Sequence, residues 1–268
     1  MTKIMKNQII MLIKDSSFIR CCIYSIFSAL GLVMMTWALG NAMPDVFLDA
    51  LSAMNERGTI NLGYIQFESI EQINTMTTNN MFALAYSSPF IVVIMSVFSV
   101  ESYWKNCKNG YYQFLMSRRV SRKRIFLSQV GAASLINLST YFLFGCVCFI
   151  SSQFSFGFSG SWLSVLGALR QLIVVVAITS VFTFGICVFK KIVSTVIFVI
   201  LVSIGTPALM EFIGALFQNE KIKYLWIGTC ATYTGSEIRI WTYIIIVSVF
   251  YIFLSALGGS YIFSKQDM

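Results

Sequence analysis

Two long apolar segments without a charged residue flank a short, strongly basic one. The apolar segments are residues 81–100 and 125–150, and the basic segment is residues 101–124. The basic segment carries seven Lys and Arg residues against one acid, Glu101. A helix needs about 20 apolar residues to cross a hydrocarbon core about 30 Å thick. Each flank is long enough, so the chain is predicted to be a membrane protein with a charged segment exposed at one membrane surface.

The composition excludes several classes of protein. Hydrophobic residues make up 57% of the chain and charged residues only 11%, whereas a soluble domain has about 25% charged residues. The net charge of +8 does not indicate nucleic-acid binding, because the positive charges lie at the ends of apolar segments, where they set topology. The chain has no histidine, which excludes Ser-His-Asp and Cys-His catalysis and sites with histidine ligands to zinc or haem. No pair of intramembrane acids is apparent, so we expect neither an enzyme nor a bound metal or cofactor.

The hydrophobic pattern predicts an all-α membrane protein with a single transmembrane domain over residues 1–268. Six helices are predicted to cross the membrane, at about residues 21–39, 81–100, 125–150, 163–189, 192–217 and 240–263. Residues 1–20 mix isoleucines with lysines, which favours an amphipathic helix lying in the membrane interface. A polar tail whose lysines only set topology is the alternative.

The distribution of Lys and Arg predicts the orientation. With the N-terminus inside, fourteen of the 19 Lys and Arg residues fall in cytosolic segments and five in outer ones, as the positive-inside rule requires. Both termini and residues 101–124 are then cytosolic. Residues 40–80 and 218–239 are extracellular, and they hold most of the acids.

Two charges near the outer face are predicted to lie at matching depth. Arg170 lies 20 residues before Lys190, and Glu211 lies 20 residues after Lys191. At 1.5 Å per helical residue, each lies about 30 Å from the turn that joins the two antiparallel spans. The spacing predicts an outer-leaflet salt bridge between Arg170 and Glu211, and two independent snorkelling charges are the alternative.

The order of residues in the basic segment is similar to that in a known protein family. Glu101 closes the second apolar segment, a Gly-led stretch begins at Gly110, and a Ser-Arg-Arg-Val-Ser-Arg element covers residues 117–122. This order resembles the permease subunits of bacterial, exporter-like ABC-2-type transporters, and the six-span layout is similar as well. One departure is Gln129, which stands where a lysine is frequent in that family.

The resemblance implies that the basic segment couples the chain to an ATPase. Phe114, Leu115 and Met116 give residues 111–117 an apolar side, which suits a short helix that inserts into a groove on a soluble partner. The alternative is that the basic residues only set topology and bind anionic lipid headgroups. The expected coupling residues are Glu101, Gly110, Tyr111, Tyr112, Phe114, Leu115, Met116, Ser117, Arg118, Ser121 and Arg122.

The chain itself carries no phosphate-binding G-x-x-x-x-G-K-[ST] motif. The resemblance therefore implies a cytosolic ABC ATPase as a separate subunit, which would bind the ATP and magnesium, and a second permease, identical or related. It also implies a multi-pass protein of the bacterial plasma membrane that exports an amphipathic compound or peptide. The alternatives are a non-transporting membrane sensor or anchor, the substrate-capture subunit of an energy-coupling vitamin transporter, and a membrane enzyme. Co-purification of an ATPase separates the permease from the sensor, the anchor and the enzyme.

Overall fold

The computed structural model describes residues 2–42, 60–62, 65–67, 89–156, 169–189, 191–217, 220–233 and 238–265. Among these residues, every element is a helix except one antiparallel ribbon of two strands, β1 (Ile60–Leu62) and β2 (Ile65–Phe67). This architecture is consistent with the predicted all-α class. Most of the predicted outer segment 40–80 lies outside the described residues.

The helices follow the predicted apolar segments in order. They are α1 (Thr2–Ile13), α2 (Ser16–Ala42), α6 (Pro89–Lys108), α7 (Tyr111–Ser117), α8 (Arg122–Phe156), α10 (Leu172–Phe189), α11 (Ile192–Ile200), the π-helix η1 (Leu201–Gly205), α12 (Thr206–Leu216), the 3₁₀-helix η2 (Glu220–Leu225), α13 (Ile227–Thr232) and α14 (Ile238–Lys265). Within the described residues, four segments are long and apolar enough to cross a membrane: Ser16–Met35 of α2, Arg122–Ser155 of α8, α10 and α14.

The helix α6 does not end where the second apolar segment ends. It continues from Glu101 to Lys108, about two turns further. Glu101 and Lys105 are four residues apart on this helix and form an ion pair at 3.7 Å, a spacing that supports a helix. The helix ends just before Asn109 and Gly110, and Gly110 has a left-handed φ of 65°, a conformation that glycine adopts without strain.

The fifth predicted span, residues 192–217, is interrupted by a π-helical turn. The chain runs from α11 through η1 into α12, and the π-helical turn locally widens the helix. The Thr206 hydroxyl donates to the Leu201 carbonyl at 2.7 Å, and the Trp226 indole donates to the Val202 carbonyl at 3.2 Å. The Leu201 carbonyl also accepts the Thr206 backbone N–H, whereas the indole of Trp226 gives the Val202 carbonyl a donor from a later segment of the chain.

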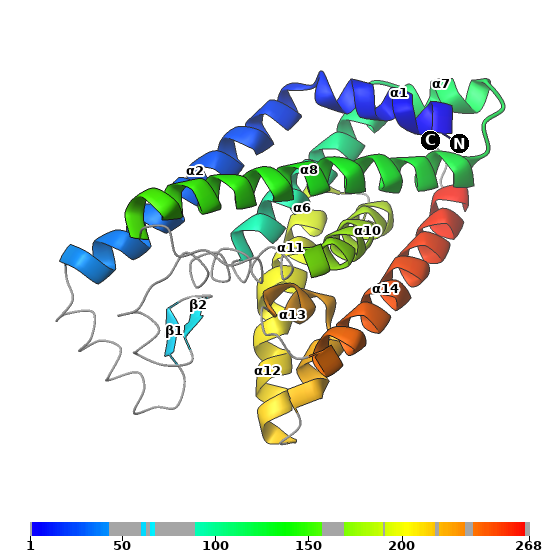
Figure 1. The fold of residues 1–268 in the computed structure, drawn as a ribbon. Helices are drawn as coiled ribbons and strands as arrows, with labels where there is room; N and C mark the ends of the chain where they lie inside the picture. Colours follow the sequence, from blue (N-terminus) through cyan, green and yellow to red (C-terminus); the bar gives the residue numbers. More distant parts are fainter. Residues whose placement is uncertain are drawn as a thin grey trace.

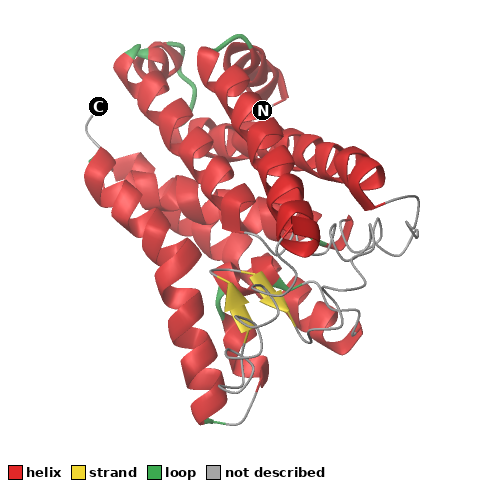
Figure 2. Ribbon diagram, turned by 90° about the vertical axis from the view of Figure 1, so that its left-hand side faces the viewer, coloured by secondary structure: helices red, strands yellow, loops and turns green. Residues whose placement is uncertain are grey.

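Several helix ends that are far apart in the sequence meet at one end of the molecule. Figure 1 shows α1, α7, the start of α8 and the end of α14 together at this end. Arg122 donates to the Ser264 carbonyl at 3.0 Å, and the Cys187 thiol donates to the Tyr103 hydroxyl at 3.6 Å, which brings the end of α10 to the same region. Both views place β1 and β2 away from the ends of the chain (Figures 1 and 2). We call the end formed by α1, α7, the last turns of α6, α10 and α14 and the first turn of α8 the basic end.

Candidate partner-docking site

The predicted short helix over residues 111–117 is confirmed, and its two ends have clear local causes. Gly110 supplies the left-handed turn that reverses the chain after α6. At the other end, Arg119 has φ 60°. The Arg119 N–H donates to the Met116 carbonyl at 2.9 Å, and the Val120 N–H donates to the Leu115 carbonyl at 3.2 Å. This pair of bonds is the Schellman arrangement that ends many helices, here with an arginine where glycine is usual, at a cost of about 1–2 kcal/mol.

One face of α7 is anchored in the bundle by aromatic contacts. Tyr112 is only 1% exposed. The centroid of its ring lies 5.6 Å from the ring centroid of Tyr103 of α6 and 5.6 Å from that of Phe263 of α14. Phe263 also lies 5.9 Å from Phe126 of α8. Leu115 is buried on the same face as Tyr112. These contacts fix α7 directly to α6 and α14 and, through Phe263, to α8.

The opposite face of α7 is open. The Phe114 side chain is 52% exposed, and the Arg118 guanidinium lies 5.0 Å above its ring, a cation–π contact. Gln113 and Ser117 are exposed beside it. Phe114, Leu115 and Met116 therefore do not share one apolar side as the sequence suggested, because consecutive helical residues point about 100° apart. Leu115 points inward, Met116 is half-buried and Phe114 points outward.

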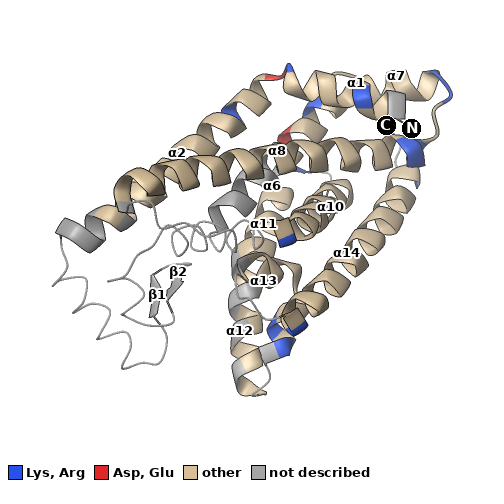
Figure 3. Cartoon of the chain, viewed as in Figure 1, with Lys and Arg blue, Asp and Glu red and all other residues tan. Residues whose placement is uncertain are grey.

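Positive charge surrounds this face. Figure 3 shows Lys and Arg gathered at the basic end and only two acids there, Asp15 and Glu101, among the residues drawn in colour. The exposed or half-buried cations at this end are Lys6, Lys14, Arg20, Lys105, Lys108, Arg118, Arg119, Arg122, Lys123, Arg124 and Lys265. Ser121 is exposed between them. An exposed aromatic ring within a positive field is suited to a partner groove lined by apolar and acidic residues.

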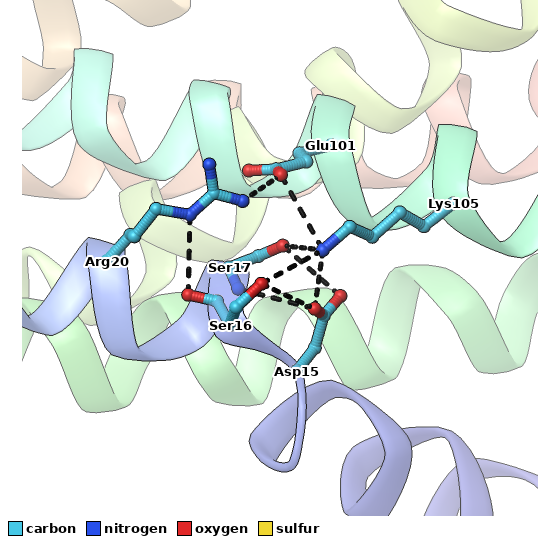
Figure 4. Close-up of polar contacts among 6 residues, drawn as sticks. All are labelled: Asp15, Ser16, Ser17, Arg20, Glu101 and Lys105. Carbon is cyan, nitrogen blue, oxygen red and sulfur yellow. Dashed lines mark hydrogen bonds and ion pairs between the residues drawn. The ribbon is translucent and has the colours of Figure 1, made fainter.

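The two acids hold α6 against the turn between α1 and α2 (Figure 4). Arg20 pairs with Glu101. The Lys105 ammonium donates to Asp15 at 2.5 Å and to the Ser17 hydroxyl at 2.8 Å. Glu101, expected from the sequence to be a coupling residue, is thus paired with Arg20 and Lys105 within the protein.

The contacts in this cluster lower the pKa of Asp15. Partial burial alone would raise the pKa of its carboxyl, but the hydrogen bonds from Lys105 and from the Ser17 N–H outweigh burial and hold it below the ordinary value of 3.8. A carboxyl whose pKa is lowered by folding stabilises the folded state at pH values above the ordinary pKa of that carboxyl. That contribution is lost as the pH falls through the lowered value.

Replacing Lys105 by methionine is expected to lower stability at neutral pH by about 1 kcal/mol, the upper end for partly exposed ion pairs. The variant leaves Asp15 and Glu101 close together without the ammonium between them. The difference in stability between the variant and wild type should shrink as the pH falls below 3.8 and Asp15 becomes protonated. Melting temperatures in detergent across this range measure it. Lys108→Met, at an exposed lysine of the same helix, is the control, and an equal loss in both variants would contradict the role of the cluster.

A set of buried amides lies below α7, and the sequence did not indicate which partners they would bind. Asn106 donates to Gln129 at 3.1 Å, and Gln129 donates to the Ser102 hydroxyl at 3.4 Å. Deeper in the bundle, Asn137 donates to the hydroxyls of Ser99 and Thr179, each at 3.0 Å. These bonds connect α6 to α8 and α8 to α10. A lysine in place of Gln129 would bring a charge into this buried pair, so the glutamine fits its surroundings.

The predicted salt bridge between Arg170 and Glu211 lies partly outside the described residues. Arg170 lies just before α10, with its guanidinium 5.8 Å above the ring of Trp241 in the first turn of α14. The side chain of Glu211 is not among those described, so the pair stays a prediction. Next to Arg170, the Gln171 amide donates to the Tyr233 carbonyl at 2.6 Å.

Comparison with protein-family models, with curated proteins and with solved structures found no match. Within the described part of the chain, no three His, Cys, Asp or Glu side chains are grouped as metal ligands would be. The candidate site therefore rests on the geometry of α7 and of the helices that hold it.

Proposed function

We propose that this chain is the membrane-spanning permease subunit of an ATP-driven transporter and that α7 receives the movement of a separate cytosolic ATPase. The observation that carries the proposal is the division of α7 into a buried and an exposed face. Tyr112 and Leu115 are buried in the bundle, while Phe114 and Arg118, four residues apart, face outward on the other side of the helix. A helix that only reversed the chain would need no exposed aromatic ring.

The packing of α7 supports a role in transmitting force. Tyr112 contacts Tyr103 and Phe263, and Phe263 contacts Phe126. A push on Phe114 would move Tyr112 with it, because both belong to one short helix. Closely packed interiors pass on such displacements instead of absorbing them. The movement would therefore reach α6, α8 and α14, which is what coupling to ATP hydrolysis requires.

The arrangement of charges supports six spans with both termini in the cytosol. We propose that α2, α6, α8, α10, the run from α11 to α12, and α14 cross the membrane. The cations predicted to be cytosolic on α1, α6, α8 and α14 and in the turn after α7 gather at the basic end, and the positive-inside rule assigns this end to the cytosol. The proposed location is the bacterial plasma membrane.

The remaining parts of the proposal concern partners and cargo. A second permease, identical or related, would complete the transport unit, and the ATPase would bind ATP and magnesium. The exported molecule would be an amphipathic compound or peptide. The aromatic residues and buried hydroxyls of the spans suit such a cargo, although packing between helices uses the same residues.

The test is capture of the ATPase from native membranes. The intact chain is purified in mild detergent, and co-purifying proteins are identified by mass spectrometry and scored for a nucleotide-binding ATPase. Phe114→Asp should lose the ATPase, because removing a central aromatic contact commonly costs about 2 kcal/mol or more, roughly thirtyfold in affinity.

Phe154→Asp is the matched control. Phe154 is 87% exposed and lies near the other end of α8, so the same substitution there should leave ATPase capture unchanged. Wild-type protein that is intact in the membrane but brings down no ATPase would refute the proposal and favour a sensor or anchor. Equal loss in both variants would refute docking at α7.

A further inference from the structure

The turn between α7 and α8 holds an exposed serine shortly after a pair of arginines. Residues 118–121 read Arg-Arg-Val-Ser and lie outside both helices. The side chains of Arg118, Arg119 and Ser121 are all exposed. The Ser121 carbonyl accepts the Ile125 N–H at 3.1 Å, which places Ser121 immediately before the first turn of α8. The Ser121 hydroxyl therefore lies at the surface, in a turn at the basic end.

The order of these residues is typical of a substrate of basophilic serine kinases. Such a kinase binds the residues that precede its target serine, and carboxylates in its binding groove select positive charge there. Arg118 and Arg119 lie three and two residues before Ser121. Because the turn is exposed and not helical, a kinase can bind it without unfolding a helix. The sequence and the backbone together make the Ser121 hydroxyl a candidate acceptor for phosphoryl transfer.

Ser117, the last residue of α7, offers a comparison within the same segment. It is exposed as well, but the residues three and two before it are Phe114 and Leu115, which are apolar. Its backbone is helical, and its hydroxyl donates to the Phe114 carbonyl at 2.7 Å. Ser117 therefore has neither the preceding arginines nor the non-helical backbone that Ser121 has.

A phosphate on Ser121 would enter strongly positive surroundings. The first turn of α8 holds Arg122, Lys123 and Arg124 and no acidic residue, although the N-terminal end of a helix is the positive end of its dipole. A phosphoserine carries about −1.5 to −2 charges at neutral pH. The phosphate would thus offset cations that the helix dipole disfavours, and it would lower the positive field at the outer face of α7.

We propose that Ser121 is phosphorylated by a basophilic serine kinase and that the phosphate weakens docking of the ATPase at α7. In the transfer, the Ser121 Oγ bonds to the γ-phosphorus of ATP. The bond from that phosphorus to the oxygen bridging to the β-phosphate breaks, ADP leaves, and the hydroxyl proton passes to a base of the kinase. The effect on docking rests on the proposed function, since there the phosphate repels the acidic groove expected on the ATPase.

The site is tested in native membranes that contain the full chain, incubated with magnesium, ATP and cytosol of the same cells as the source of kinase. Mass spectrometry of chymotryptic peptides spanning residues 115–126 locates the phosphate. Wild type and the control Ser117→Ala should carry it on Ser121, and Ser121→Ala should carry none. The double variant Arg118→Gln, Arg119→Gln should incorporate about tenfold less, because the kinase loses charge-assisted contacts. Wild type without phosphate on Ser121, or equal phosphate in the arginine variant, would overturn the proposal.

The effect on docking is measured by ATPase capture with the phosphorylated chain and with the same chain after phosphatase treatment. The phosphorylated chain should bind the ATPase about five- to tenfold more weakly, and the difference should shrink at high salt, which screens exposed charges. Ser121→Asp should weaken capture, and the neutral control Ser121→Asn should not. Equal capture by both forms would overturn the regulatory role of the phosphate. A chain that carries the phosphate but captures no ATPase in either form would refute the proposed function and support the modification site alone.

Discussion

Replacing Tyr112 by alanine is expected to release α7 from the bundle and to abolish ATPase capture. The ring is fully buried against Tyr103 and Phe263, and removing a buried aromatic side chain costs about 3–5 kcal/mol. A seven-residue helix has too few internal hydrogen bonds to persist without such packing. A lower melting temperature in detergent and faster tryptic cleavage at Arg118 and Arg119 measure the release.

Tyr112→Phe separates the ring from the hydroxyl. Burial raises the pKa of Tyr112 well above its ordinary value, which the neighbouring Asn106 amide partly opposes. The hydroxyl nevertheless makes no hydrogen bond of standard geometry, so losing it should change stability by less than about 1 kcal/mol. Wild-type capture and melting are expected for Tyr112→Phe. If the phenylalanine variant failed as the alanine variant does, the hydroxyl and not the packing would hold α7.

The bounds of α7 could be predicted from sequence because both of its ends have local signals. Gly110 marks the turn before it, and the polar run from Ser117 to Arg119 marks the turn after it. The direction of its faces could not be predicted. Which of Tyr112 and Phe114 is buried depends on whether Phe263 lies above one or the other, and Phe263 is about 150 residues away in the chain.

The ion pairs among Asp15, Arg20, Glu101 and Lys105 could not be predicted from sequence either. Charge counting placed Arg20, Glu101 and Lys105 at one membrane surface, since topology depends on which segments carry Lys and Arg. It could not pair them, because Lys105 and Asp15 are 90 residues apart and Arg20 and Glu101 are 81 residues apart. The continuation of α6 past Glu101 could not be predicted either, because an acid followed by basic residues marks the end of an apolar segment in the sequence.

The π-helical turn η1 has no signal in the apolar pattern. Residues 192–217 are mostly apolar, with Glu211 as their single charge, and this pattern does not distinguish a regular helix from a widened one. The side chains that donate to carbonyls of the widened turn are Thr206, next to it, and Trp226, on the following segment. Only the second contact is long-range, and it depends on how the segment after α12 folds back.

Replacing Gly259 by alanine is expected to disrupt the packing of α14 on α8. A Cβ on Gly259 would lie 2.2 Å from the Phe126 ring. Phe126 is itself buried and packed against Phe263, so it has little room to move away. Adding atoms to a filled interior costs about 1–3 kcal/mol, more than the roughly 1 kcal/mol that alanine gains over glycine in a helix. Melting temperature in detergent and the yield of folded protein measure the loss.

Gly31→Ala is the control for the same substitution in another long apolar helix. A Cβ on Gly31 of α2 would have no other atom within 4 Å, so only the gain in helix propensity should remain, and this variant should melt at or slightly above the wild-type temperature. Because Phe126 and Phe263 also anchor Tyr112, Gly259→Ala should weaken ATPase capture although it changes no residue of α7. Wild-type melting and capture for Gly259→Ala would show that α8 and α14 can separate there at no cost, and α7 would then lack the rigid support that coupling needs.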